Sequence, residues 1–221
     1  KVLAKYADVE KDALRINFCF DPIMRNLSEK GEFCCGTGDE CFDTIAKFIK
    51  ATAEYKHVRV VNVAGALFSN AGSTIVEELG FTLAAAHEYL VKLMDRGLSI
   101  DEVARKIRFT FAVTSNYFLE MAKFRAARLL WANIVKAYNP EKNCSCKMRA
   151  HAVTSTWNQT VYDPYVNMLR GTTEAMSAAI AGVHSLEVLP FDYAFEAPTE
   201  FSQRIARNAQ LLLKHESHFD Q

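Results

Sequence analysis

The chain has 221 residues, half of them hydrophobic, which is enough for one folded domain with a sizeable core and excludes a disordered chain. Its 26 lysines and arginines equal its 26 aspartates and glutamates, so its net charge gives no field that would attract nucleic acid. No apolar run is long enough to cross a membrane, and we expect neither nucleic acid nor a membrane among its partners.

Five segments rich in β-branched or aromatic residues predict β-strands, and segments with helical periodicity separate them. The predicted strands are residues 14–20, 58–64, 107–113, 148–154 and 185–191. The predicted helices are residues 39–55, 74–96, a short one from 99, and then 116–139, 166–182 and 199–216. The second and third helices each begin with a pattern typical of a capping box, Thr74 with Glu77 and Ser99 with Glu102.

Strands that alternate with helices predict a parallel sheet with right-handed crossovers. Both a doubly wound sheet and a (β/α)8 TIM-type barrel have this alternation. Gly36 and Gly38 are the only hint of a dinucleotide fingerprint, and they lack its third glycine, so the barrel is favoured. Five strands are fewer than the eight of a complete barrel, so we expect a piece of a larger barrel.

The carboxyl ends of barrel strands are where chemistry is placed, and here they hold neither paired carboxylates nor a nucleophile beside a base. The segment GALFSNAG, residues 65–72, is predicted to be a strand-to-helix loop with apolar side chains in place of titratable ones. His151 is the most informative titratable residue, and strand alternation puts it on one face with Arg149 and Val153. Two interpretations stay open for it, a side chain in the barrel mouth and a hydrogen-bonded core histidine.

Three further patterns have simpler explanations than a binding site. His215 and His218 lie three residues apart, as a metal-binding pair would, but no third ligand is evident and no metal site is expected. The helix around Lys123, Phe124 and Trp131 could be a basic aromatic patch, but an amphipathic barrel helix explains it more simply. Six cysteines without a zinc-like spacing, and a charged start instead of a signal peptide, predict reduced thiols and a cytoplasmic location.

Four longer stretches carry a more specific signal: AGALFSNAGSTIVEELGFTLAAAHEYL, AKFRAARLLWANIVK, MRAHAVTSTWNQTVYDPYVNMLRGTTEA and PTEFSQRIARNAQLLLKHES. They resemble the barrel domain of the adenosylcobalamin-dependent methylmalonyl-CoA mutase family, whose members carry SGYHMQEAG in the first stretch and a DPYNN motif in the third. The resemblance extends over nearly the whole chain, so residues 1–221 are identified as part of an acyl-CoA mutase barrel domain.

The resemblance implies a barrel that encloses an acyl-CoA and a radical rearrangement between methylmalonyl-CoA and succinyl-CoA. In the family, a separate C-terminal domain binds the cobalamin, and the cofactor supplies the radical chemistry. This chain resembles roughly the last five strands of the barrel, without the cobalamin domain or the N-terminal tyrosine segment. We therefore expect it to bind no cofactor itself, with adenosylcobalamin held by a catalytic partner.

The resemblance also implies where the family's functional residues fall on this sequence. The histidine that binds the thioester carbonyl falls on Leu67, and its neighbours, a tyrosine, a glutamine and a glutamate, fall on Ala66, Ser69 and Asn70. Other substrate positions carry different residues here: glutamines fall on Phe20 and Val153, an arginine on Lys30, and a basic residue and a serine near the CoA on Lys106 and Arg108. On the cofactor face, a glycine falls on Thr156 and a glutamate on Tyr193. Of these positions, only His151 matches its family counterpart outright.

The joint replacement predicts a degenerate site with no catalytic residue, because a buried leucine or valine would leave the ligand's polar atoms unpaired. The leading hypothesis is the small (beta) subunit of a heterodimeric mutase, which stabilises the large (alpha) catalytic subunit without catalysing the reaction itself. The alternative is a catalytically active acyl-CoA mutase of altered acyl specificity. A third possibility is a half-barrel that self-associates through the unpaired edges of its sheet.

Overall fold

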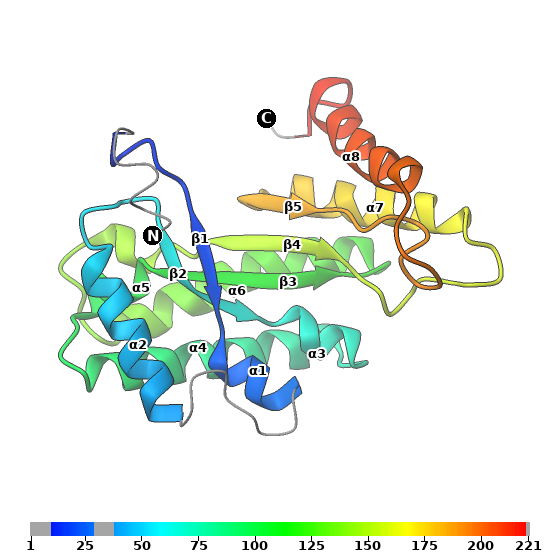
Figure 1. Ribbon diagram of the computed structural model, residues 1–221. Helices are drawn as coiled ribbons and strands as arrows, with labels where there is room; N and C mark the ends of the chain where they lie inside the picture. The colour runs from blue at the N-terminus through cyan, green and yellow to red at the C-terminus, as the bar shows by residue number, and fades with distance from the viewer. Residues whose placement is uncertain (1–9, 29–37, 220–221) are drawn as a thin grey trace. The chain divides into compact units, whose positions relative to one another are not determined.

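The computed structural model describes residues 10–28 and 38–219, whose strands form one sheet with parallel pairing. The strands follow one another in the order β1 (Asn17–Phe20), β2 (Arg59–Ala64), β3 (Ile107–Val113), β4 (Ala150–Thr154) and β5 (Ser185–Glu187) (Figure 1). The helices are α1 (Pro22–Ser28), α2 (Gly38–Ala51), α3 (Ala66–Asn70), α4 (Ile75–Met94), α5 (Ile100–Ala104), α6 (Tyr117–Lys136), the 3-10 helix η2 (Asn143–Cys146), α7 (Val166–Ile180) and α8 (Glu200–His215). Parallel strands that alternate with helices confirm the predicted class, part of a (β/α)8 barrel.

Four of the predicted strands are longer than the observed ones, β1 and β5 by the most, and the short helices α1 and α3 occupy segments that were not predicted to be helical. β1 starts at Asn17 and β5 ends at Glu187, so the predicted ends at residues 14 and 191 are wrong. α3 occupies the GALFSNAG segment, which was predicted to be a loop. α1 follows Asp21, whose Oδ1 accepts a hydrogen bond from Met24 N–H at 3.2 Å, and proline suits the first helical position.

Both predicted capping boxes are present. The Ser99 hydroxyl accepts from Glu102 N–H at 3.3 Å, and the Glu102 carboxylate accepts from Ser99 N–H at 2.8 Å. Thr74 and Glu77 exchange the same two hydrogen bonds, at 3.3 and 2.8 Å. Each box satisfies N–H groups that the first turn of a helix leaves unpaired, which fixes where α5 and α4 begin.

The chain forms two compact units. Unit 1 comprises Lys1–Val63, Ala85–Arg108 and Ala132–Lys147, and unit 2 comprises Ala64–Ala84, Phe109–Trp131 and Met148–Gln221. In the part of the chain that the structure describes, no helix is both long and apolar enough to span a membrane.

Unit 1 is held together by aromatic side chains around α2. The Phe20 ring at the end of β1 lies 5.2 Å from the ring of Phe48 in α2. The buried Tyr89 of α4 donates its O–H to Asp21 Oδ1 at 2.7 Å and accepts from Ile23 N–H at 3.1 Å. These contacts fasten the end of β1 and the start of α1 to two different helices.

Unit 2 has its core between α6 and β3. The Phe109 ring of β3 lies 4.8 Å from Trp131, and the Phe111 ring lies 5.8 Å from Phe124. All four side chains are fully buried, and the small Ala150 of β4 lies opposite Phe109 in the sheet. The interpretation of α6 as an amphipathic barrel helix is therefore confirmed.

Candidate functional site

The GALFSNAG segment in unit 2 places its side chains on two sides of α3. Ala66 and Ser69 are buried, whereas Leu67 is 43% exposed. The expectation of a buried leucine at this position is therefore wrong. Leucine has no polar atom, however, so the position where the resemblance implies a histidine still offers no hydrogen bond to a carbonyl oxygen.

Two glycines let α3 lie close to its neighbours in unit 2. A Cβ atom on Gly65 would lie 2.1 Å from Thr82 Oγ1 in α4, which is far inside the contact distance. Gly72 has a φ of +98°, and its Cβ atom would lie 3.0 Å from the Trp157 ring. The glycine spacing of this segment is thus explained by packing and backbone conformation, independently of any chemistry.

We expect Gly65→Ala to destabilise the fold by about 1–3 kcal/mol, because its methyl group would overlap the Thr82 hydroxyl. Gly80→Ala is the matched control, since Gly80 lies within α4 and nothing lies within 4 Å of its added Cβ atom. That control should stabilise the fold by about 0.5–1 kcal/mol, because alanine is the better helix former. Urea unfolding measures the stability of the Gly65→Ala and Gly80→Ala variants. Combining Gly65→Ala with Thr82→Ala removes the hydroxyl and should recover part of the lost stability. Equal stability of Gly65→Ala and Gly80→Ala would contradict the overlap.

Asn70 connects α3 to the segment that follows β4. Its Oδ1 accepts hydrogen bonds from the Ser155 hydroxyl at 3.3 Å and from Thr156 N–H at 3.1 Å. The amide oxygen at the position of the family's glutamate is therefore used to hold the backbone of its own chain.

The two positions expected on the cofactor face do not fit a corrin held as the resemblance implies. Thr156 carries a β-branched, half-buried side chain where the resemblance puts a glycine under the ring. Tyr193 carries a phenol, 49% exposed, where it puts a carboxylate. A bulkier residue and a lost charge at these positions give cobalamin neither the room nor the acceptor that the family pattern provides.

His151 lies in the first half of β4, opposite Ser185 of β5. Its Nδ1 lies 2.8 Å from Ser185 Oγ and its Nε2 lies 3.7 Å from Glu187 Oε2, and the side chain is 12% exposed. These contacts favour the hydrogen-bonded histidine of the two interpretations. The barrel mouth lies beyond Thr154, at the other end of the strand, and Val153 lies one residue before that end, half-buried.

Lys106, in unit 1, directs its ammonium group to the end of α2. Its Nζ donates hydrogen bonds to the backbone oxygens of Thr52 at 2.5 Å and Tyr55 at 2.9 Å, and the residue is buried. Burial lowers the Lys106 pKa to about 8, and the positive charges of Arg59 and Arg105 lower it further in the same direction. The basic residue that the resemblance places near the CoA thus bonds to its own backbone.

Of the remaining expected positions of unit 1, the structure describes Phe20 and Arg108. Phe20 uses its ring in the aromatic contact with Phe48. Arg108 is half-buried in β3. Lys30 lies outside the described residues.

A buried ionic cluster lies at the carboxyl end of β3 in unit 2, and the sequence analysis did not predict it. Lys123 Nζ donates to Glu78 Oε2 and to the Ala112 oxygen, both at 2.6 Å, and lies 2.6 Å from Glu120 Oε2. Glu78 Oε1 accepts from Ala112 N–H at 2.8 Å, and Glu120 Oε1 accepts from Thr114 N–H at 3.1 Å. The cluster therefore binds the backbone at three points, two at Ala112 of β3 and one at Thr114, the residue after the strand.

The cluster makes hydrogen bonds to backbone groups on one edge of β3. Phe109 N–H donates to the oxygen of Arg149, the residue before β4, so alternate residues pair with β4 and Ala112 faces the opposite edge. Glu78 and Lys123 satisfy the N–H and C=O of Ala112 there. Two carboxylates share one ammonium group, and burial raises the Glu78 pKa although Lys123 opposes it.

Glu174 of α7 also accepts hydrogen bonds from the chain just after the end of β4. Its Oε2 accepts from Ser155 N–H at 3.1 Å and its Oε1 accepts from the Asn158 amide at 2.5 Å. Burial raises the Glu174 pKa to about 7, although both hydrogen bonds lower it. The carboxylates at these strand ends therefore accept hydrogen bonds from backbone N–H groups of their own chain.

The spacing of residues along α6 could have predicted this cluster from the sequence. Glu120 and Lys123 lie on the same helical stripe as Phe124, Ala127 and Trp131, which face the core. A charged pair within an apolar stripe predicts a buried ion pair.

Comparison with known proteins agrees with the resemblance. The family model for methylmalonyl-CoA mutase matches residues 2–221. The chain belongs to the methylmalonyl-CoA mutase family. The predicted membership is thereby confirmed over nearly the whole length of the chain.

Three relatives show how much of a complete protein the chain represents. It is 54% identical over 171 residues to the methylmalonyl-CoA mutase small subunit of Porphyromonas gingivalis, covering 77% of this chain and 28% of the relative. It is 40% identical over 157 residues to the large subunit of the same organism, covering 71% and 22%. It is 44% identical over 174 residues to the methylmalonyl-CoA mutase of Rhizobium meliloti, covering 78% and 24%. The chain thus spans between a fifth and a third of the length of these relatives.

Proposed function

We propose that this chain is part of the small, non-catalytic subunit of a cytoplasmic, adenosylcobalamin-dependent mutase that interconverts methylmalonyl-CoA and succinyl-CoA. Its role is to stabilise the large catalytic subunit, which holds the cofactor, in a heterodimer. The observation that carries this proposal is Leu67, an apolar side chain at the position where the resemblance implies the histidine that binds the thioester.

The other expected site positions also support the proposal. Loss of one positioned donor to a developing oxyanion typically costs ~2.7–4 kcal/mol of transition-state stabilisation. Asn70 is engaged with Ser155 and Thr156, and His151, in the first half of β4, with Ser185, so these polar side chains already have partners within the chain. An apolar residue at the position of the thioester-binding histidine, together with polar residues that already have partners, supports a scaffold role over catalysis.

The names of the two P. gingivalis relatives support the same assignment. The identity to the protein named as a small subunit is higher, and extends over more residues, than the identity to the protein named as a large subunit. Those names describe a mutase of two subunits in P. gingivalis. By analogy, we assign this chain to the small subunit.

The proposal is tested with the natural polypeptide that contains this chain, purified alone and together with the large subunit. Alone, we expect no change in the visible spectrum of added adenosylcobalamin and no succinyl-CoA from methylmalonyl-CoA. Together, the two chains should co-elute, and the large subunit should unfold at a higher temperature than it does by itself. Turnover by the polypeptide alone would overturn the proposal.

The alternative is an active acyl-CoA mutase with altered acyl specificity. The match to the R. meliloti protein, named as a mutase without a subunit designation, favours it, as does the retained His151. Restoring Leu67→His together with Val153→Gln separates the two: activity that rises by orders of magnitude supports the alternative, and unchanged absence of activity supports the small-subunit assignment.

A further inference from the structure

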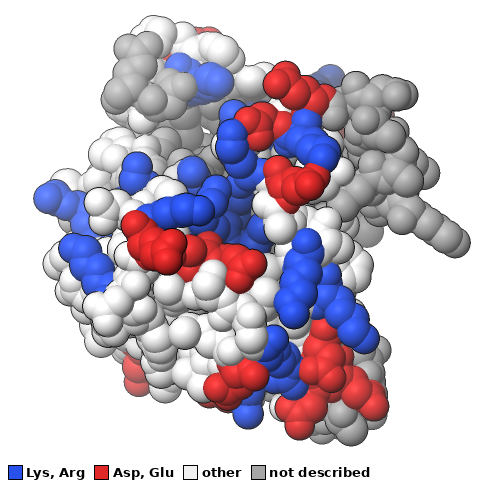
Figure 2. Space-filling view, turned by 90° about the vertical axis from the view of Figure 1, so that its left-hand side faces the viewer, with Lys and Arg blue, Asp and Glu red and all other residues white. Residues whose placement is uncertain are grey.

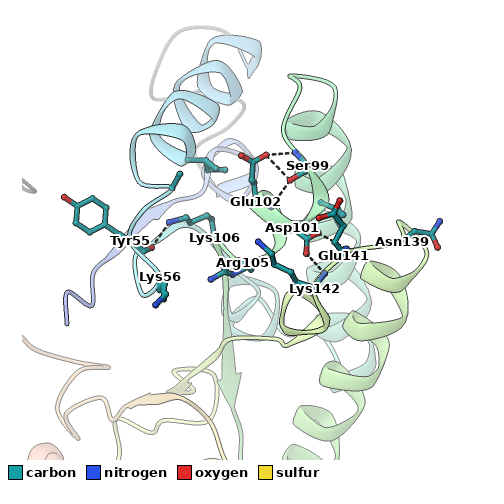
Figure 3. Close-up of a pocket in the computed structure, with 13 residues that line it drawn as sticks. Tyr55, Lys56, Ser99, Asp101, Glu102, Arg105, Lys106, Asn139, Glu141 and Lys142 are labelled. Carbon is teal, nitrogen blue, oxygen red and sulfur yellow. Dashed lines mark hydrogen bonds between the residues drawn. The ribbon is translucent and has the colours of Figure 1, made fainter. Parts of the chain in front are cut away.

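The charges around the cavity of unit 1 are mixed in sign. That cavity, of about 650 Å³, lies between the end of α2, the helix α5 and the segment after α6, and both basic and acidic side chains line it (Figure 3). Figure 2 shows the same mixture on the side of the molecule from which β2 and β3 begin. Interspersed charges of both signs are typical of a solvated surface, so this region does not identify a ligand by its charge.

Exposed apolar side chains are concentrated in unit 2. Among the described residues, Leu27 is the only large hydrophobic side chain of unit 1 that is exposed, and all the others lie in unit 2. Those on α6 are between 42% and 78% exposed, and they are Phe118, Leu119, Leu129 and Leu130. The helix α6 therefore carries apolar side chains on its outer face as well as on the face toward the core.

The charged residues of α6 have the opposite arrangement. Glu120 and Lys123 are buried in the ionic cluster at the end of β3. Arg128 is half-buried and donates a hydrogen bond to the Gly182 oxygen at 2.7 Å. Arg125 is exposed in the middle of the outer face and forms no salt bridge within the part of the chain that the structure describes. The outer face thus carries a positive charge and no exposed carboxylate.

The exposed side of α6 forms a continuous patch, which we name the α6 face. Its members recur at the three- and four-residue spacing of one side of a helix, and they are Phe118, Leu119, Ala122, Arg125, Leu129 and Leu130. Val76 and Trp157 extend the patch, because both line a cavity together with Leu119. These side chains expose on the order of 800 Å². A stable interface buries about 800 Å² per partner, whereas a monomer rarely exposes so large an apolar patch.

Completion of the barrel leaves the α6 face uncovered. The helix follows β3, which has β2 and β4 as its neighbours in the middle of the strand order. Further strands of a barrel add to the free edges at β1 and β5. The α6 face points away from the sheet, because Phe124 and Trp131 on the other side of α6 pack against β3. The face is therefore open to a separate body.

The charge of Arg125 argues against a second copy of this chain as that body. In a two-fold contact of the α6 face with itself, Arg125 of one copy would lie near Arg125 of the other, because it occupies the middle of the face. Neither α6 face would supply a carboxylate, and unpaired like charges in an interface are unfavourable. A different chain that offers apolar side chains and a carboxylate fits the face better.

We propose that the α6 face is the surface through which this chain binds the large catalytic subunit. The inference rests on the heterodimer proposed above and adds the place of contact. The large subunit covers Phe118 and Leu129 with apolar side chains and places a carboxylate opposite Arg125. Aromatic residues and arginine are the usual anchors of an interface, and apolar contacts around them exclude water.

The test is the dissociation constant of the natural polypeptide and the large subunit, measured by calorimetric titration. The double variant Phe118→Gln/Leu129→Gln should weaken association by about thirtyfold or more, because two anchors are lost from the centre of the contact. Arg125→Glu should weaken it by about tenfold or more, and by more than Arg125→Gln does, since it places a carboxylate opposite a carboxylate. These side chains are exposed, so the variants should unfold at the wild-type temperature when measured alone.

The control is Phe201→Gln/Leu212→Gln, which removes the same two types of side chain from exposed positions of α8. It should change the dissociation constant by less than about twofold. Failure of the wild-type polypeptide to bind the large subunit would overturn the heterodimer and this inference together. Binding that the Phe118→Gln/Leu129→Gln variant leaves unchanged, or that both double variants weaken equally, would overturn this inference alone.

Two other occupants of the α6 face would give different results. If a second copy covers it, the wild-type polypeptide alone should sediment as a dimer and the Phe118→Gln/Leu129→Gln variant as a monomer. If another segment of the same polypeptide covers it, that variant should unfold at a lower temperature than the wild type in the absence of the large subunit. Either result would overturn the proposal.

Discussion

Replacing Lys123 with methionine is expected to destabilise the fold by about 3–5 kcal/mol. The methionine keeps most of the side-chain volume but removes the ammonium group, so Glu78 and Glu120 are left as two buried carboxylates without a cation. The Ala112 oxygen also loses the ammonium group that donates a hydrogen bond to it. Urea unfolding at pH 7.5 measures the loss.

A second substitution, at Glu78, tests whether the unpaired buried carboxylates cause the loss of stability. Lys123→Met combined with Glu78→Gln should be more stable than Lys123→Met alone, because one of the two unpaired carboxylates is then neutral. Lys136→Met at the exposed end of α6 serves as the control and should change stability by less than about 0.5 kcal/mol. A Lys123→Met variant as stable as this control would show that the buried charges are not coupled.

The order of elements could be predicted from the sequence because it depends on local patterns. Strand composition, helical periodicity and the capping boxes at Thr74 and Ser99 all act within a few residues, and the predicted strands and helices occur in the predicted order, although several strands are shorter. The helix α1 was not predicted, although Asp21 and Pro22 form a typical helix start, because its seven residues are too few for a helical periodicity.

The hydrogen-bond partners of the expected site residues could not be predicted from local patterns. They depend on contacts between residues that are distant in the sequence. The amide of Asn70 meets Thr156, and the ammonium of Lys106 meets the Thr52 oxygen, in each case across more than fifty residues. The resemblance implies only at which positions of the chain these residues lie. It could not tell that their polar atoms are engaged within the chain, since a sequence pattern does not say where a side chain points.

Glu174→Gln is expected to make the fold more stable at pH 8 and to leave it almost unchanged at pH 5. The Glu174 pKa is about 7 in the folded protein, because burial raises it above the ordinary value of 4.5. The folded state therefore binds more protons than the unfolded state between pH 4.5 and 7, so the free energy of unfolding falls as pH rises through that window. The expected contribution of this one group is roughly 3 kcal/mol.

The hydrogen bonds around Glu174 explain why glutamine should be tolerated. Glutamine keeps one oxygen to accept from Ser155 N–H and gains an N–H₂ group as a donor. Asn158 Oδ1 is buried and has no hydrogen-bond partner among the described residues, so rotation of the Asn158 amide would provide the acceptor for that donor. Neutral glutamine thus mimics the protonated acid, whereas Glu174→Leu should destabilise the fold at every pH because it leaves Ser155 N–H unpaired.

Urea unfolding of the wild type and of Glu174→Gln between pH 5 and pH 8 measures the effect as a difference, so that other titrating groups cancel. The difference should grow as pH rises and level off above pH 7, where the wild-type carboxylate is charged in both states. Glu196→Gln, at an exposed position in the segment before α8, should show no such trend. A stability difference that is constant from pH 5 to pH 8 would mean that Glu174 is ionised throughout, and that its hydrogen bonds outweigh its burial.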